Sequence, residues 1–511
     1  MAVEAGSLEQ REPASRTRHR FVLPALAVAG VAGFALFLIG LQRMASDRFG
    51  LLLAMAAFAL VAALLGLRNP VLACTYLLAA TFFRLAIPTN TFPVDPFLPA
   101  FAGVVVAVWV WARPRGNGLP GLHVTEAVLA LYIGWNIGSM LAPHQYAAGA
   151  PQDVLGFSVL RFVLIGTVMP LIMFLVGKTI FRDELAIRRL SWMLLVAGAY
   201  SSMVSIMQFH GPKGLVWPRY IIDEPNWPGR AVGVFNQPVV NGLVLIVGFL
   251  VAVLIASHRE EVLWLRGVSV VVAGASAYAI FLTHTRAVWL SFALVVLIGL
   301  VTAKGFRRPF VITAMVMVVT VVADWSALTS TDRSAGGVAS KSELQDRLNT
   351  IATSIWAIEV KPLLGWGIGR FPAVNTYHHQ QWSPETPWQR GYGIPSHLDV
   401  LGIFTELGLV GIALWLTILA LIITQVLRAT RRLPVHGLCN RPFALTALMS
   451  VVALIATGLT VDLRFFDLPN IVVMKQAGAA IGRAAQVDEL DFPPGLDRSS
   501  TPVPPSFTPV P

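Results

Sequence analysis

The sequence predicts an all-α polytopic membrane protein with about 12–14 transmembrane helices and one large extracytoplasmic loop that carries an amphipathic helix. Three observations support this fold class. Hydrophobic residues make up 56% of the 511 residues and charged residues only 13%, with a mean hydropathy of +0.69. The apolar residues occur in runs near the roughly 20 residues that a bilayer requires of a helix. The cations gather in short loops between these runs, a composition that excludes a soluble domain.

Each apolar run is expected to form a helix, because backbone polar groups in lipid must be hydrogen-bonded within their own segment. A weaker run at 467–483, interrupted by Lys475, is a further candidate span. Residues 21–41 lack the small-residue cleavage pattern of a signal peptide, so we expect no cleavable leader. The main runs cover residues 21–41, 49–66, 70–87, 97–112, 124–142, 157–177, 186–208, 238–257, 265–283, 286–302, 309–327, 398–427 and 443–463.

The loop charges predict the orientation of the chain. With the N-terminus inside, the loops that face the cytoplasm carry most cations, as the positive-inside rule requires. The net charge of +11 therefore reflects topology and predicts no nucleic-acid partner. An even number of spans places the C-terminus inside and favours 467–483 as the last span. The inward cations are Arg68, Arg113, Arg115, Lys178, Arg182, Arg188, Arg189, Arg259, Arg266, Lys304, Arg307, Arg308, Arg428, Arg431, Arg432 and Arg441.

The same pattern divides the chain into five parts. Cys74 and Cys439 would lie at different depths, so we expect neither a disulfide nor a metal site from them. The predicted parts are a disordered cytoplasmic tail at 1–20, an N-terminal transmembrane bundle at 21–327, a large extracytoplasmic loop at 328–397, C-terminal transmembrane helices at 398–484 and a disordered Pro-rich cytoplasmic tail at 485–511.

The large loop holds one clear helical pattern. Leu344, Leu348, Ile351, Ile355 and Ile358 form an apolar stripe at helical spacing, and Pro362 ends it. This pattern predicts an amphipathic helix on the membrane surface. The aromatic stretch that follows this helix fits two interpretations equally well: an interfacial belt of Trp and Tyr, or a functional surface.

Two arginines and one histidine are the candidate functional residues. Arg230 precedes a span and Arg286 begins one, each after an outer loop. His397 ends the large loop just before the run at 398–427. Paired guanidiniums at one depth are suited to a pyrophosphate, because the planar fork binds two phosphoryl oxygens. A histidine beside them can accept a proton near neutral pH. Together they indicate transfer from a lipid pyrophosphate to a hydroxyl.

Four motifs, in order along the chain, resemble those of the O-antigen ligase and polymerase superfamily, which are membrane glycosyltransferases of the GT-C type. The resemblance covers roughly residues 230–465. The motifs are Arg230 to Pro238 before a span, Thr283-His-Thr-Arg286-Ala-Val-Trp-Leu290, the block from Arg347 through Pro362-Leu-Leu-Gly-Trp-Gly-Ile-Gly-Arg-Phe371, and His397-x10-Gly408.

The resemblance implies an undecaprenyl-pyrophosphate-linked glycan as donor, with Arg230 and Arg286 on its pyrophosphate and His397 activating the acceptor hydroxyl. Transfer would invert the anomeric carbon at the outer face of the cytoplasmic membrane, without metal or cofactor. Glu406 would orient His397 or contact the acceptor, with pairing to a neighbouring helix as an equal alternative. Leu398 and Thr285 depart from the usual small polar residue and serine, which affects the expected details of the acceptor.

Other functions stay open at this point. A ligase, a polysaccharide polymerase and a protein O-oligosaccharyltransferase would share the donor and differ in the attacking hydroxyl, which belongs to a glycan, a glycolipid or a protein. A transporter or flippase of lipid-linked glycans is the alternative from another class, because charged residues within spans often mark a substrate path. A non-catalytic scaffold is a third. The charges in question are Arg84, Glu126, Arg161, Asp324 and Asp462.

Overall fold

The computed structural model confirms the all-α fold class. No strand occurs in the part of the chain that the structure describes. The tails, the predicted span at 21–41 and most of the run at 49–66 lie outside that part. The described residues are 60–61, 64–65, 67–84, 97–112, 123–151, 157–223, 225–330 and 341–491.

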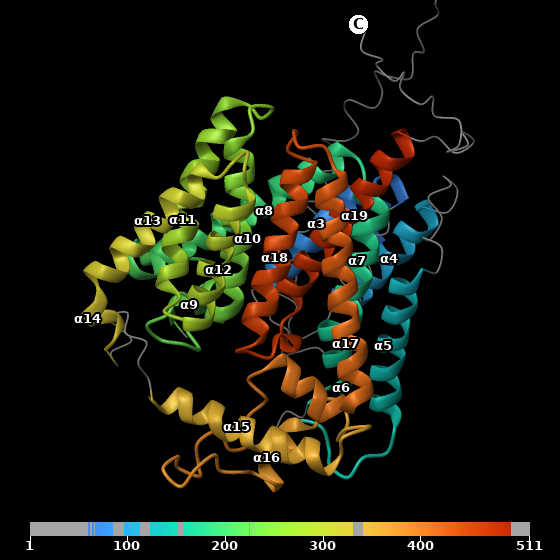
Figure 1. The fold of residues 1–511 in the computed structure, drawn as a ribbon, viewed down its shortest axis with the longest axis vertical. Helices are drawn as coiled ribbons and strands as arrows, with labels where there is room; N and C mark the ends of the chain where they lie inside the picture. The colour runs from blue at the N-terminus through green and yellow to red at the C-terminus, as the bar shows by residue number, and fades with distance from the viewer. Residues whose placement is uncertain are drawn as a thin grey trace, which may run out of the picture.

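The helices fall where the apolar runs predict them, and most run along one common direction (Figure 1). Pro at the first turn begins several of them, where its missing N–H costs nothing. The helices of the bundle are α3 (Pro70–Phe82), α4 (Phe97–Ala112), α5 (Val124–Leu141), α6 (Val159–Val163) continued through a π-helical turn (Leu164–Val168) into α7 (Met169–Ile180), α8 (Glu184–His210), α10 (Pro238–Ser257), α11 (Leu263–Leu282), α12 (Arg286–Thr302), α13 (Arg308–Ala323), α17 (Asp399–Arg432), α18 (Arg441–Gly458) and α19 (Asp467–Asp491).

Seven of the described helices are long and apolar enough to cross a membrane, so the protein is a multi-pass membrane protein. Further apolar helices of 10–17 residues accompany them, at Pro70–Phe82, Ala100–Val110, Arg286–Thr302 and Arg308–Ala323. The helix α10 is buried along almost its whole length and packs against α8, α11 and α18. The weak run at 467–483 forms α19, which packs along α7 and is buried inside the bundle. Its fully buried Lys475 explains why hydropathy underrates this segment.

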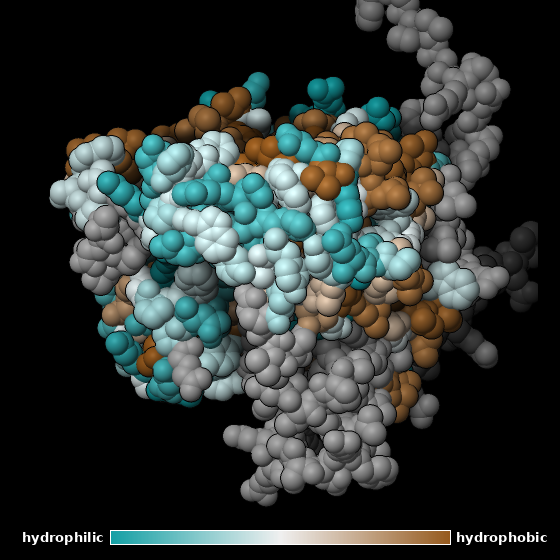
Figure 2. Space-filling model, turned by 90° about the horizontal axis from the view of Figure 1, so that it is seen from below, coloured by the Kyte–Doolittle hydropathy of each residue, from teal (hydrophilic) through white to brown (hydrophobic). Residues whose placement is uncertain are grey.

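The loop domain, residues 341–397, lies at the end of the bundle opposite to the end of α19 at Asp491 (Figure 1). It contains α15 (Lys341–Val360) and α16 (Phe371–Tyr377). Seen from this end, the surface is mostly hydrophilic at its centre and lower left, and hydrophobic along its upper and right edges (Figure 2). This distribution is typical of a water-facing domain on a lipid-embedded bundle.

The predicted amphipathic helix is present as α15, but its polar face is the one that packs. Asn349, Thr350 and Thr353 are buried, whereas Leu344 and Ile355 of the apolar stripe are exposed. The reason is hydrogen bonding, because the buried amide and hydroxyl groups bind the loop segment that follows α16. That the apolar stripe lies on the membrane surface stays a prediction.

Three of the charges that suggested a transport path have ion-pair partners inside the protein. Arg84 pairs with Asp467, and the Lys178 ammonium lies 2.6 Å from Glu126. Asp462 lies 2.6 Å from the Arg464 guanidinium. Paired charges of this kind hold helices together and are less available to a passing substrate.

Candidate functional site

The loops that carry Arg230 and Arg286 are bound to each other. The Ala231 N–H donates to the Leu282 carbonyl oxygen at 2.9 Å, and His284 Nδ1 is hydrogen-bonded to the Gly229 carbonyl oxygen at 2.7 Å. His284 adopts the left-handed conformation, with φ 43°, that turns its ring toward Gly229. The structure therefore brings together two arginines that are 56 positions apart in the sequence.

The backbone of Arg230 is held firmly, while its side chain meets a carboxylate. The side-chain amide of Gln208 donates to the Arg230 carbonyl oxygen at 2.9 Å and accepts from the Val232 N–H at 3.2 Å. The Arg230 guanidinium is paired with Glu343 of α15 and lies 5.1 Å from the centre of the Trp227 ring. Arg230 thus reaches from the bundle to the loop domain.

Arg286 is the first residue of α12, and its guanidinium has no ion-pair partner among the described residues. Its Nε is buried and makes no hydrogen bond there either. A buried donor without a partner costs roughly 1–3 kcal/mol. An anion that accepts from this guanidinium would recover that free energy.

Arg347 of α15 completes a guanidinium cluster with Arg230 and Arg286. Burial is the main cause that lowers the pKa of Arg347; the nearby Glu343 opposes it, and the cations of Arg286 and Arg230 lower it further. Arginine stays protonated despite such a shift. Three positive charges therefore lie near one another where the bundle meets the loop domain.

His397 lies next to this cluster, two residues before α17 begins. Its pKa is lowered, mainly by burial and further by the Arg347 cation, while Asp346, Asp462 and Glu343 act in the opposite direction. The imidazole is therefore neutral at pH 7 and able to accept a proton. Within the described residues its ring nitrogens make no hydrogen bond.

A polar core in the loop domain holds the segment that leads to His397. Asn375 of α16 donates to the carbonyl oxygens of Gly391 at 2.6 Å and Ile394 at 3.0 Å. Asn349 donates to the Arg390 carbonyl oxygen at 2.9 Å. Asp346 accepts from the Gly391 N–H at 2.8 Å, which ties the same segment to α15. These bonds position His397 without touching it.

Glu406 is buried and fully engaged away from His397. One carboxylate oxygen lies 2.7 Å from Arg464 Nη1, and the other accepts from the Phe371 N–H at 3.0 Å. Arg464 also forms two bonds to Asp462, at 2.9 and 2.6 Å. This geometry favours the alternative in which Glu406 pairs with a neighbouring element, and its part in catalysis stays a prediction.

The helix α17 is interrupted at Gly408, where φ is 66° and ψ is −168°. The Leu409 N–H donates to the Pro362 carbonyl oxygen at 2.8 Å instead of to Thr405. The freed carbonyl oxygens of Thr405 and Glu406 accept from the N–H groups of Trp366 at 2.9 Å and Gly367 at 2.8 Å. The segment 362–367 thus replaces the hydrogen bonds that the helix loses. This seam, 362–367 against 405–409, explains the glycines at 365 and 408, where an added Cβ would collide with main-chain atoms of the opposite segment.

We expect Gly408→Ala to lower the free energy of unfolding by about 1–3 kcal/mol through the backbone alone, because only glycine readily adopts this conformation. An added Cβ would also collide with the Leu363 carbonyl group. Thermal unfolding in detergent measures the effect. Gly274→Ala in α11 is the matched control, since no atom lies within 4 Å of its added Cβ. Equal stability of the two variants would contradict the role given to the seam.

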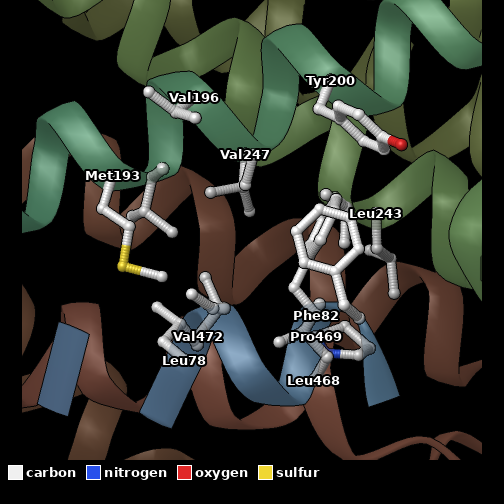
Figure 3. Close-up of a pocket in the computed structure, with 15 residues that line it drawn as sticks. Leu78, Phe82, Met193, Val196, Tyr200, Leu243, Val247, Leu468, Pro469 and Val472 are labelled. Atoms are coloured by element: carbon white, nitrogen blue, oxygen red, sulfur yellow. The ribbon is translucent and has the colours of Figure 1, made fainter. Parts of the chain in front are cut away.

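An apolar cavity of about 120 Å³ lies between α3, α8, α10 and α19 (Figure 3). None of the predicted site residues lines it. Phe82 of its wall packs edge-on against Phe235, with ring centres 5.3 Å apart, and Phe235 follows Arg230 by five residues. The cavity is chemically suited to a hydrocarbon group and borders the loop of Arg230.

The fold and the site together define a multi-pass membrane protein in which arginines of two loops meet a histidine at one end of the bundle. Residues 271–416 match the model of a family described as O-antigen ligase. The match confirms the resemblance to the O-antigen ligase superfamily and supports a ligase-like or polymerase-like enzyme. It includes Arg286, Arg347, His397 and Glu406, whereas Arg230 precedes it. Among curated proteins, none matches the chain.

Sequence reasoning alone missed the parts played by Arg347 and Arg464. Arg347 opens the third motif, but nothing in the sequence says which face of α15 it occupies. Arg464 lies just beyond the predicted span 443–463, and the structure ends α18 earlier, at Gly458. The pattern Asp462-x-Arg464 was the available signal for a local ion pair.

Proposed function

We propose that the protein transfers a glycan from undecaprenyl pyrophosphate to an acceptor hydroxyl, without a metal and with inversion at the anomeric carbon. The observation that carries this proposal is the meeting of the Arg230 and Arg286 loops with Arg347 and His397. Three guanidiniums beside a neutral histidine suit a reaction in which an anionic group leaves as a hydroxyl loses its proton. The O-antigen ligase match supports the same class of reaction.

In the proposed reaction, a ring nitrogen of His397 takes the proton of the acceptor hydroxyl as its oxygen attacks the anomeric carbon. A new carbon–oxygen bond forms on the face opposite the pyrophosphate. The bond from carbon to the pyrophosphate oxygen breaks, and its electron pair stays on that oxygen. Arg230 and Arg286 stabilise the negative charge that develops there. The loop domain places the acceptor on the side of His397.

The apolar cavity next to the Arg230 loop also favours a lipid-linked donor. Its lining, including Leu243, Val247 and Val472, is suited to part of a polyprenyl chain whose pyrophosphate reaches the guanidinium cluster. A donor anchored in this way would present its glycan to the water-facing loop domain, at the extracytoplasmic side of the membrane.

The direct test uses purified protein and a labelled undecaprenyl-pyrophosphate-linked glycan. Release of undecaprenyl pyrophosphate together with a glycosylated acceptor supports transfer. Movement of the intact donor across a vesicle membrane, with no release, would support the transporter alternative instead. In a strain that lacks the protein, unlinked extended lipid-bound chains would indicate a ligase and single repeat units a polymerase.

We expect Arg286→Lys to reduce transfer about tenfold or more even though it keeps the positive charge. An ammonium is a point charge and cannot bind two phosphoryl oxygens in parallel, as the planar guanidinium can. The measurement is the initial rate of undecaprenyl pyrophosphate release with saturating acceptor. Arg428→Lys is the control, because this exposed residue near the far end of α17 should tolerate the change. Full activity of Arg286→Lys would show that Arg286 does not need to bind two phosphoryl oxygens at once.

A further inference from the structure

The helix α15 directs two charged residues of opposite sign toward the bundle. Glu343 and Arg347 are one helical turn apart and therefore lie on the same face. Glu343 forms the ion pair with Arg230, and Arg347 interacts electrostatically with Arg286 and Arg230. Both also influence His397. This face of α15 thus lies between the two loop arginines and the histidine.

The charges at this place do not balance within the described residues. Three guanidiniums lie near one another, and the carboxylate of Glu343 is paired with that of Arg230. The other acidic residue nearby on α15, Asp346, is bound to Arg390 at 2.6 Å. Nε of Arg286 is buried without a partner. An excess of buried positive charge of this kind favours a ligand with more than one negative charge.

The two side chains of the Arg230–Glu343 pair differ in their exposure to water. The Arg230 side chain is 11% exposed, whereas the Glu343 side chain is 38% exposed. Glu343 can therefore turn into water, which hydrates its carboxylate, while the more buried Arg230 stays where it is. A phosphate oxygen can take the position of the Glu343 carboxylate oxygen, because both accept from the same guanidinium N–H groups.

We propose that α15 forms one wall of the donor site: Arg347 is a third guanidinium for the pyrophosphate, and Glu343 holds Arg230 until the pyrophosphate displaces it. The inference rests on the proposed function and deepens it. Because α15 also binds the segment that leads to His397, the same helix contacts the donor and supports the general base. Donor affinity is then set by a competition between Glu343 and the pyrophosphate for Arg230.

The test measures binding of labelled undecaprenyl pyrophosphate to the full-length protein in detergent, with undecaprenol as the uncharged comparison. We expect Arg347→Gln to weaken binding about tenfold or more, which is the loss of one charge-assisted hydrogen bond. We expect Glu343→Gln to tighten binding several-fold, because the competing carboxylate is gone. Binding of undecaprenol should change in neither variant. Lys341→Gln and Glu359→Gln, on exposed positions of the same helix, are the matched controls.

The outcomes separate the inference from the proposed function. If Arg347→Gln binds with wild-type affinity, Arg347 does not bind the pyrophosphate. If Glu343→Gln binds with unchanged or lower affinity, Glu343 does not compete with the pyrophosphate for Arg230. If the wild-type protein binds undecaprenyl pyrophosphate no better than undecaprenol, the proposed function fails and the inference fails with it. Arg347→Lys, expected to bind with intermediate affinity, serves if Arg347→Gln is not stable.

Discussion

Replacement of His397 by alanine is expected to reduce glycan transfer by about 100-fold to 10,000-fold, the usual contribution of a general base. The imidazole lies outside α17 and makes no hydrogen bond within the described residues, so its removal should leave the unfolding temperature unchanged. Rates of undecaprenyl pyrophosphate release and thermal unfolding in detergent measure the two effects. His436→Ala, at an exposed position of another loop, is the control. Substantial activity in His397→Ala would exclude the base role.

The pH dependence of transfer provides a second check on His397. Burial and the Arg347 cation lower its pKa, against the opposing effect of Asp346, Asp462 and Glu343. A base works when it is unprotonated, so activity should fall as the pH drops through this pKa. We therefore expect a plateau at pH 7 and a loss of activity below about pH 6.5, the ordinary histidine value. An acid limb centred above pH 7 would contradict this assignment.

Replacement of Arg464 by methionine is expected to cost about 3–5 kcal/mol of unfolding free energy, because it leaves buried carboxylates without their cation. The side chains of Arg464 and Glu406 are 7% and 2% exposed, so water cannot compensate. Glu406 also holds the Phe371 N–H, and transfer should therefore fall together with stability. Thermal unfolding in detergent and transfer rates report both losses.

Two further variants keep the Arg464 prediction testable if the methionine variant does not fold. Arg432→Met removes an exposed ion pair with Asp488 and should have little effect. The triple change Glu406→Gln, Asp462→Asn and Arg464→Met removes the cation together with both carboxylates that pair with it, and should recover much of the lost stability. If Arg464→Met is as stable as Arg432→Met, the network does not hold the loop domain to the bundle.

The helices of the bundle could be predicted because lipid imposes a strong and local requirement. The start and end of α10 and α12 match the predicted runs 238–257 and 286–302. The segment of α19 was harder to predict, since Lys475 and Gln476 lower its hydropathy although both are buried. Hydropathy measures transfer into lipid and cannot recognise a helix that is covered by other helices.

The site was predictable in part, for a related physical reason. Arg230 and Arg286 were expected at one depth, and the structure adds the hydrogen bonds that join their loops. The position of Arg347 depends on which face of α15 packs. The apolar stripe does not show which face packs against the protein. That face is held by Asn349, which donates to the Arg390 carbonyl oxygen 41 positions away, and by Thr353, which accepts from the Gln380 N–H 27 positions away. Such long-range bonds leave no periodic signal.

The seam between 362–367 and 405–409 consists of main-chain groups on both sides. Main-chain bonds depend on backbone geometry and tolerate many side chains, provided that the glycines remain. Exposed side chains of the loop domain, such as Trp382, take no part in this seam and can be replaced without breaking its hydrogen bonds. Under the proposed function, this arrangement lets acceptor preference change by substitution on the exposed surface of the loop domain while the seam is kept.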